Sequence, residues 1–132
     1  MVLKFLLIDD DLDDRELFCE AIHAIVPETS CYTAAGASKA LEKLKNEEIP
    51  RPDIIFLDIN MPGINGWQCL SILKNQETYK DIPVILYSTT SHVEDVLRGQ
   101  SLGALCFFTK PTSFKELKKS MEVVVSHLNN DS

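Results

Sequence analysis

The 132-residue chain carries a net charge of −7 and is 45% hydrophobic and 25% charged, which suits one soluble globular domain over residues 1–132. Its apolar runs fall short of the roughly 18 residues that span a membrane, and its N-terminus lacks the basic start and cleavage site of a signal peptide, so we expect a cytoplasmic protein. The acidic balance argues against binding to the phosphate backbone of nucleic acids.

Hydrophobic spacing in the first half of the chain predicts three strands and two helices. The nearly unbroken apolar run at 3–8 is typical of a strand covered on both faces. Apolar residues from Leu17 to Ile25 then repeat at helical spacing, and Pro27 ends that helix. The next elements are a short strand near 31–34, a helix over 37–44 and a strand at 53–57 that ends on Asp58.

The second half of the chain continues the alternation. Trp67 and Leu70 indicate a helix after a turn at Pro62-Gly63, and further strands are expected at 83–87 and 105–108. Capping boxes predict the starts of the last two helices, and they consist of Ser91 with Glu94 and of Ser113 with Glu116. Gly103 is suited to a left-handed turn at the end of the fourth helix, and residues 129–132 are expected to form a polar tail.

Polar residues stand where the predicted strands end. Strands that alternate with helices predict a parallel sheet covered on both faces, and ligands of such sheets bind beyond the carboxyl ends of the strands. Crossovers between these strands are expected to be right-handed. The polar groups at these ends are Asp9-Asp10-Asp11, Asp58 with Asn60, Ser88, and Lys110.

These residue types indicate phosphoryl chemistry. Asp9, Asp10 and Asp58 would repel one another unless a cation neutralises them, and Mg²⁺ suits a site with few carboxylate ligands. A carboxylate can attack phosphorus to give an aspartyl phosphate, a reaction that needs mainly positioning and charge neutralisation. Lys110 adds a second positive group, and Ser88 can donate a hydrogen bond to a phosphoryl oxygen.

The four cysteines are expected to be reduced and buried. They lie far apart and form no Cys-x-x-Cys pair, so neither a zinc site nor a redox motif is indicated. Each has apolar neighbours, which favours small buried thiols. The residues are Cys19, Cys31, Cys69 and Cys106.

Four motifs resemble the receiver domain of two-component response regulators. They occur in the family's order and cover essentially the whole chain. The motifs are Asp9-Asp10, Asp58-Ile59-Asn60-Met61-Pro62-Gly63, Tyr87-Ser88-Thr89 and Lys110-Pro111. The resemblance implies a flavodoxin-like doubly wound (βα)5 fold with strand order 2-1-3-4-5. It also implies the stand-alone, single-domain type, because the chain carries no second output domain.

The resemblance assigns a role to each site residue. Asp58 is the expected phosphoacceptor, assisted by Ser88 and Lys110. Asp10 is expected to bind Mg²⁺ or Mn²⁺ directly, Asp9 mostly through water, and Asn60 through its backbone carbonyl. Ser88 and Phe107 are the expected switch pair, in which the hydroxyl moves to the phosphate and the aromatic ring fills the vacated space.

The resemblance also implies partners. The phosphoryl donor is expected to be a sensor histidine kinase or a histidine phosphotransfer protein, and the chain is not expected to be an enzyme. A surface made of the fourth helix, fifth strand and fifth helix is the expected output face, through which a downstream protein or a second copy would bind.

Three alternatives compete with this interpretation. A calcium-binding EF-hand loop starting at Asp9 fails because Asp14 stands where glycine is required. A dehalogenase-type phosphatase fails because Asp13 stands where that motif needs threonine or valine. An adaptor that keeps the receiver fold without being phosphorylated stays open, as does the choice between a phosphorelay intermediate and an end effector.

Overall fold

Five strands and five helices alternate in the computed structural model, which describes residues 3–61, 63–89 and 92–130. None of the helices in these ranges has the length and apolar character needed to cross a membrane. In chain order the elements are β1 (Lys4–Ile8), α1 (Leu12–Ile25), β2 (Ser30–Ala34), α2 (Ala37–Lys45), β3 (Ile54–Asp58), α3 (Gly66–Lys74), β4 (Val84–Ser88), α4 (Val93–Ser101), β5 (Cys106–Thr109) and α5 (Phe114–Asn130).

The strands form one parallel sheet in the order β2-β1-β3-β4-β5. The central strands β3 and β4 are buried along their whole length, which explains why their sequences are unbroken apolar runs rather than alternating ones. The chain crosses from β1 to β2 on one side and returns to β3 on the other, so strand order reverses between β1 and β3. The predicted doubly wound fold and its strand order are confirmed.

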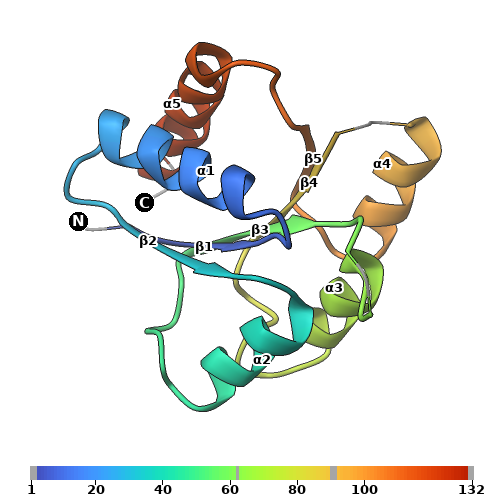
Figure 1. Cartoon of the computed structure of the whole chain (residues 1–132). Helices are drawn as coiled ribbons and strands as arrows, with labels where there is room; N and C mark the ends of the chain where they lie inside the picture. Colours follow the sequence, from blue (N-terminus) through green and yellow to red (C-terminus); the bar gives the residue numbers. More distant parts are fainter. Residues whose placement is uncertain (1–2, 62, 90–91, 131–132) are drawn as a thin grey trace.

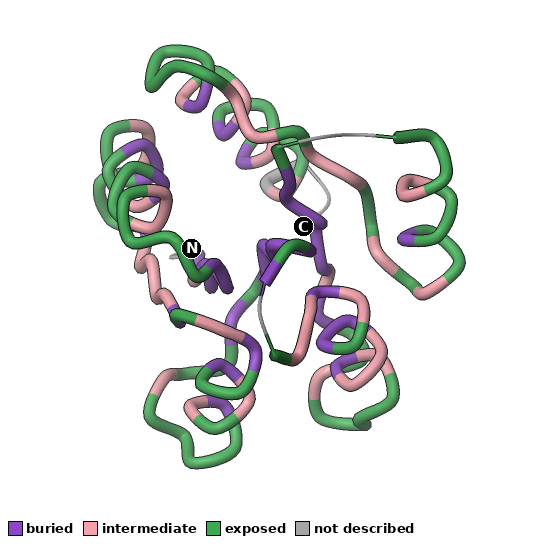
Figure 2. Tube along the Cα trace, turned by 45° about the vertical axis from the view of Figure 1, so that its right-hand side comes forward, coloured by how far each residue is buried: buried purple, intermediate pink, exposed green. Residues whose placement is uncertain are grey.

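Helices cover both faces of the sheet (Figure 1). Helices α1 and α5 lie over one face, where they enclose a core rich in aromatic rings, including Phe18, Phe56 and Tyr87. The rings of Phe18 and Phe56 meet edge to face with centroids 4.9 Å apart. A second core on the other face packs under α2 and α3, and the buried residues gather along the central strands (Figure 2).

The edges of the fold are more exposed than the sequence suggested. Leu17, which the helical spacing placed on the inner stripe of α1, is 43% exposed, and Phe18, Ala21 and Ile22 are the residues that α1 buries. Leu105, predicted to lie within the fifth strand, precedes β5 and is 60% exposed. Because β5 pairs with β4 alone, it lies at the edge of the sheet and does not share the burial of the central strands.

Side-chain caps define the helix starts. Asp11 caps α1, and Asn65 forms a capping box with Gln68 at the start of α3, which was not predicted from the sequence. Ser113 Oγ accepts a hydrogen bond from the Glu116 N–H at 3.2 Å, as expected for the opening of α5. The other predicted box involves Ser91, which lies outside the described residues; α4 has His92 as its N-cap.

Two helix ends can be compared with the expectations. Gly103 has φ +98°, the left-handed conformation expected after α4. Helix α5 continues to Asn130, two residues into the segment expected to be a polar tail, and 131–132 lie outside the described residues.

The expectation of four reduced, buried thiols is wrong for three of the cysteines. Cys19 of α1 and Cys31 of β2 form a disulfide across a Cα–Cα distance of 5.7 Å. Cys106 is a free but exposed thiol, and only Cys69 is both free and buried. Burial raises the pKa of Cys69 to about 12, which keeps its thiol protonated and unreactive. The pairing was invisible in the sequence because folding alone brings α1 and β2 together.

We expect purified protein kept without reductant to present two reactive thiols when denatured, and four after treatment with dithiothreitol. Closing a loop of this length is worth about 3 kcal/mol of stability in the chain-entropy model, so Cys31→Ala should lower the urea midpoint. Thiol labelling followed by mass measurement checks the count, and Cys106→Ala serves as the control that leaves the pair intact. Four reactive thiols without reductant would contradict the disulfide.

Candidate functional site

Three carboxylates meet at the carboxyl edge of the sheet, beside the point where strand order reverses. Asp9 directly follows β1, Asp58 ends the neighbouring β3, and Asp10 follows Asp9. One carboxylate oxygen from each lies within 4.8 Å of the others. Asp9 and Asp58 are buried whereas Asp10 is exposed, so the cluster opens to solvent on one side. The structure therefore brings together the acids that the sequence predicted would meet.

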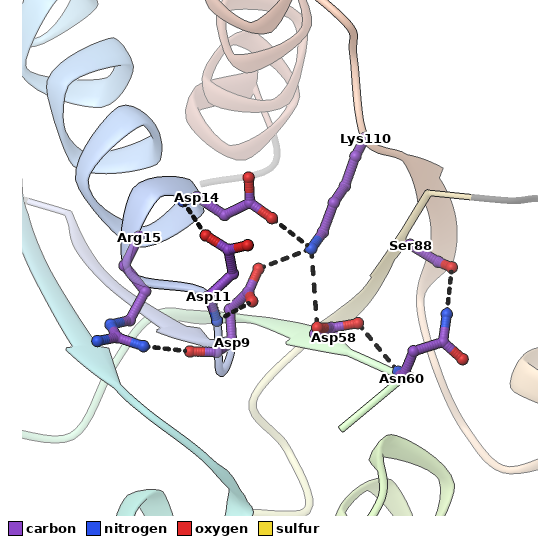
Figure 3. A network of polar contacts seen from close by, with 8 residues as sticks. All are labelled: Asp9, Asp11, Asp14, Arg15, Asp58, Asn60, Ser88 and Lys110. Atoms are coloured by element: carbon purple, nitrogen blue, oxygen red, sulfur yellow. Dashed lines mark hydrogen bonds and ion pairs between the residues drawn. The ribbon is translucent and has the colours of Figure 1, made fainter. Parts of the chain in front are cut away.

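Lys110, just beyond β5, sends its ammonium group into this cluster (Figure 3). Its Nζ lies 2.9 Å from Asp9 Oδ2 and 3.7 Å from Asp58 Oδ2. A third and shorter contact, 2.8 Å, joins it to Asp14 in the first turn of α1. The side chain is 11% exposed, so this single cation offsets a group of negative charges largely away from water.

The Asp58 carboxylate is oriented by a hydrogen bond, and its pKa is raised by burial. The backbone N–H of Asn60 donates to Asp58 Oδ1 at 3.0 Å. Burial raises the pKa of Asp58 from an ordinary value of 3.8 to about 6, against the lowering effects of the Asn60 hydrogen bond and of Lys110. The charges of Asp9 and Asp10 raise it further. At neutral pH the carboxylate is still mainly ionised and so remains a competent nucleophile.

Of the two residues predicted to form the switch, Ser88 is buried at the site and Phe107 is half-buried on the neighbouring strand. Ser88 ends β4, is fully buried, and its Oγ accepts a hydrogen bond from the Asn60 side-chain amide at 3.1 Å. Its carbonyl oxygen accepts the Lys110 backbone N–H at 2.6 Å. Phe107 is half-buried in β5, stands opposite Leu86 in the register, and packs against the core on the α2–α3 face.

Three contacts of the site were not predicted from sequence. Arg15 Nη1 donates to the backbone carbonyl of Asp9 at 2.8 Å, the Tyr87 ring lies with its centroid 5.2 Å from Lys110 Nζ, and Asp14 pairs with that lysine. The ammonium group of Lys110 and the Tyr87 ring thus form a cation–π contact. The available signal was the position of Asp14 in the first turn of α1, because that turn directly follows the loop that carries Asp9 and Asp10.

The site fits a hard divalent cation. The carboxylates of Asp9, Asp10 and Asp58 supply the oxygen ligands that Mg²⁺ and Mn²⁺ prefer. Among the described residues, the buried Asp9 Oδ2 has no hydrogen-bond partner, and it lies 2.9 Å from the Lys110 ammonium group. A second cation would therefore stabilise the negative charge of this buried oxygen. The carbonyl of Asn60 as a further ligand stays a prediction, and Pro62 of the same loop lies outside the described residues.

Together, fold and site define a doubly wound α/β domain with an acidic pocket and a lysine at its switch point. Residues 5–122 match the family model described as the response regulator receiver domain. The chain therefore belongs to the response-regulator receiver family of two-component systems, and the predicted resemblance is confirmed. This family is a signalling domain, binds Mg²⁺ or Mn²⁺ at an acidic pocket, and interacts in general with histidine kinases or phosphotransfer proteins.

Relatives and solved structures agree with this assignment. The chain is 30% identical over 129 residues to the phosphate regulon transcriptional regulatory protein PhoB of Klebsiella pneumoniae, covering 98% of this chain and 54% of PhoB. It thus spans about half the length of the PhoB proteins it matches. It is 28% identical over 125 residues to the response regulator Rcp1 of Synechocystis, covering 92% of this chain and 85% of Rcp1.

Two solved structures are similar over most of the fold. The Mn²⁺-bound form of response regulator Rcp1 has a TM-score of 0.82 at 27% identity, with 94% of this chain and 92% of that chain covered. The phosphorylated cyanobacterial phytochrome response regulator RcpA has a TM-score of 0.85 at 26% identity, with 94% and 91% covered.

Proposed function

We propose that this chain is a cytoplasmic phosphorelay receiver that accepts a phosphoryl group on Asp58 from a sensor histidine kinase or a histidine phosphotransfer protein. The observation that carries the proposal is the position of Asp58. It is a buried carboxylate at the end of a central strand, within 3.7 Å of a lysine ammonium group and beside two further acids. A carboxylate that served only the fold would not be set among like charges.

The chemistry follows from the groups around Asp58. A carboxylate oxygen of Asp58 attacks phosphorus, a P–O bond forms, and the P–N bond of a phosphohistidine donor breaks with its electron pair going to the histidine nitrogen. The Asn60 N–H holds Oδ1 of Asp58, so the reacting carboxylate keeps a fixed direction. Lys110 balances negative charge on the phosphoryl oxygens, because its ammonium group lies 3.7 Å from the carboxylate oxygen Oδ2 of Asp58.

Asp9, Asp10 and Asp58 are the proposed holders of Mg²⁺ or Mn²⁺, together with the Asn60 backbone carbonyl. When bound, the cation neutralises charge on the phosphoryl oxygens, in the manner common to phosphoryl transfer. The exposed carboxylate of Asp10 gives the open side of the cluster a ligand that can rearrange.

The proposed switch uses Ser88 and Phe107. Ser88 Oγ accepts a hydrogen bond from the Asn60 side-chain amide, and a rotation of the serine side chain would bring its hydroxyl toward a phosphoryl group on Asp58. Space that the hydroxyl leaves can be taken by Phe107, which is half-buried and one strand away. Such a pair is a two-state packing element that charge at Asp58 can bias.

Apolar side chains near α4 support output through protein–protein contacts. Val93 and Leu97 of α4 are 74% and 58% exposed, and Leu105, next to β5, is 60% exposed. Exposed large apolar residues of this kind mark interaction surfaces when they lie on neighbouring elements, and α4 contacts β5. A downstream protein or a second copy of the chain is the proposed occupant of this α4–β5–α5 face.

Intact-mass measurement after incubation with acetyl phosphate and Mg²⁺ tests the proposal. We expect a single phosphoryl adduct on the wild type, and none on Asp58→Asn or in the presence of EDTA. An adduct that persists on Asp58→Asn would remove Asp58 as the acceptor. If neither acetyl phosphate nor a panel of phosphorylated histidine phosphotransfer proteins labels the wild type, the unphosphorylated adaptor is the better assignment.

A further inference from the structure

The ammonium group of Lys110 is shared unevenly among three carboxylates. Its Nζ lies 2.8 Å from Asp14 Oδ2 and 2.9 Å from Asp9 Oδ2, but 3.7 Å from Asp58 Oδ2. The first two distances are those of charge-assisted contacts, whereas the third exceeds a hydrogen bond. The contact with Asp14 is also a hydrogen bond, so Lys110 is held toward α1 and away from Asp58 (Figure 3).

Asp14 is well placed to hold the lysine without joining the acidic cluster. The Asp11 side chain caps α1 by accepting the Asp14 N–H at 3.1 Å, which fixes the backbone of this first turn. The cluster of carboxylate oxygens that can hold a metal consists of Asp9, Asp10 and Asp58. Asp14 therefore takes part of the charge of Lys110 while offering the cluster no oxygen of its own.

We propose that Asp14 is a positioning residue that draws the Lys110 ammonium group away from Asp58 and so leaves the carboxylate of Asp58 open to a divalent cation. This inference rests on the metal site of the proposed function. It adds a fourth acid to the site, one that acts through the lysine.

The reason is competition between two cations for the same oxygens. Lys110 already contacts Asp9 Oδ2, and a small further movement would bring it onto Asp58 as well. A divalent cation must displace the ammonium group from those oxygens, and it does so at lower free-energy cost when the ammonium group keeps another carboxylate.

Asp13 supplies the matched control. It occupies the same first turn of α1 as Asp14, and both acids favour the helix start through the helix dipole. Asp13 is exposed, whereas Asp14 contacts Lys110. Replacing either residue by asparagine removes one negative charge at the same helix terminus, and the Asp14 variant also removes the contact with Lys110.

The test is Mg²⁺ binding to the unphosphorylated protein, measured by titration calorimetry with MgCl₂. We expect Asp14→Asn to raise the dissociation constant for Mg²⁺ by about tenfold, because Lys110 then contacts both Asp9 and Asp58. Asp13→Asn should raise it by about twofold, the effect of an exposed, screened charge. In a Lys110→Met background, Asp14→Asn should raise the dissociation constant no more than Asp13→Asn does.

Each outcome decides the inference. Equal weakening by Asp14→Asn and Asp13→Asn would overturn it and leave the proposed receiver function untouched. A difference that persists in the Lys110→Met background would also overturn it, because Asp14 would then act on the cation without the lysine. A wild-type protein that binds no Mg²⁺ would overturn both the inference and the metal site on which it rests.

Discussion

Gly66→Ala is expected to destabilise the fold by about 3 kcal/mol or more and to abolish phosphorylation of Asp58. Gly66 is the first residue of α3, and a Cβ added there would lie 2.5 Å from the Asp58 carbonyl oxygen and still closer to the Ile59 Cα. Both neighbours are backbone, so no side chain can turn aside to relieve the conflict. Either α3 moves or the segment that carries Asp58 moves.

Gly36→Ala is the matched control for this prediction. Nothing lies within 4 Å of a Cβ placed at Gly36, which precedes α2 in an extended conformation. We expect that variant to change stability by about 1 kcal/mol or less. Urea denaturation gives both free energies, and intact mass after acetyl phosphate treatment reports the site. A Gly66→Ala protein with a wild-type midpoint and full labelling would show that α3 does not pack against the Asp58 segment in this way.

The sequence could predict that the side chains of the site would lie close together because the prediction depends only on where each strand ends. Asp9 and Lys110 each directly follow a strand and Asp58 ends one, and parallel strands bring their carboxyl ends to one edge whatever their order. The strand order itself came from the resemblance to receivers, because spacing along the chain cannot distinguish one parallel order from another. The strand order was thus predicted from the family resemblance, and the site residues were predicted from the ends of the strands.

The features that were not predicted depend on how closely two helices or strands pack against each other. The Cys19–Cys31 pair, the contact of Gly66 with Ile59 and the Asp14–Lys110 hydrogen bond each join segments whose distance is set by packing. Leu17 is another case, because helical spacing identifies a stripe but does not say how wide the covered part is. Rules of composition and period describe one element at a time, whereas these features belong to pairs of elements.

Ionisation of the buried Asp58 lowers the free energy of unfolding of the protein. Asp58→Asn is expected to stabilise the protein by about 3 kcal/mol at pH 8 in EDTA, besides preventing phosphorylation. Asp58 is buried with one cation and several acids, and its pKa in the folded protein is about 6 against an ordinary 3.8. Asparagine keeps the shape of the side chain and carries no charge, so the variant avoids this unfavourable ionisation.

The pH dependence identifies the cause of this stabilisation. Because the folded protein binds the Asp58 proton more tightly than the unfolded chain does, the stability that this group contributes is fully present below pH 3.8 and is lost as the pH rises through about 6. The difference in unfolding free energy between Asp58→Asn and wild type should therefore be near zero at pH 4 and reach its full value by pH 7 to 8. Urea denaturation at several pH values measures it. Asp13→Asn, which removes an exposed acid, should show no such step. If the Asp58→Asn variant is more stable by the same amount from pH 4 to 8, asparagine packs better at this position, and ionisation of Asp58 does not cause the difference in stability.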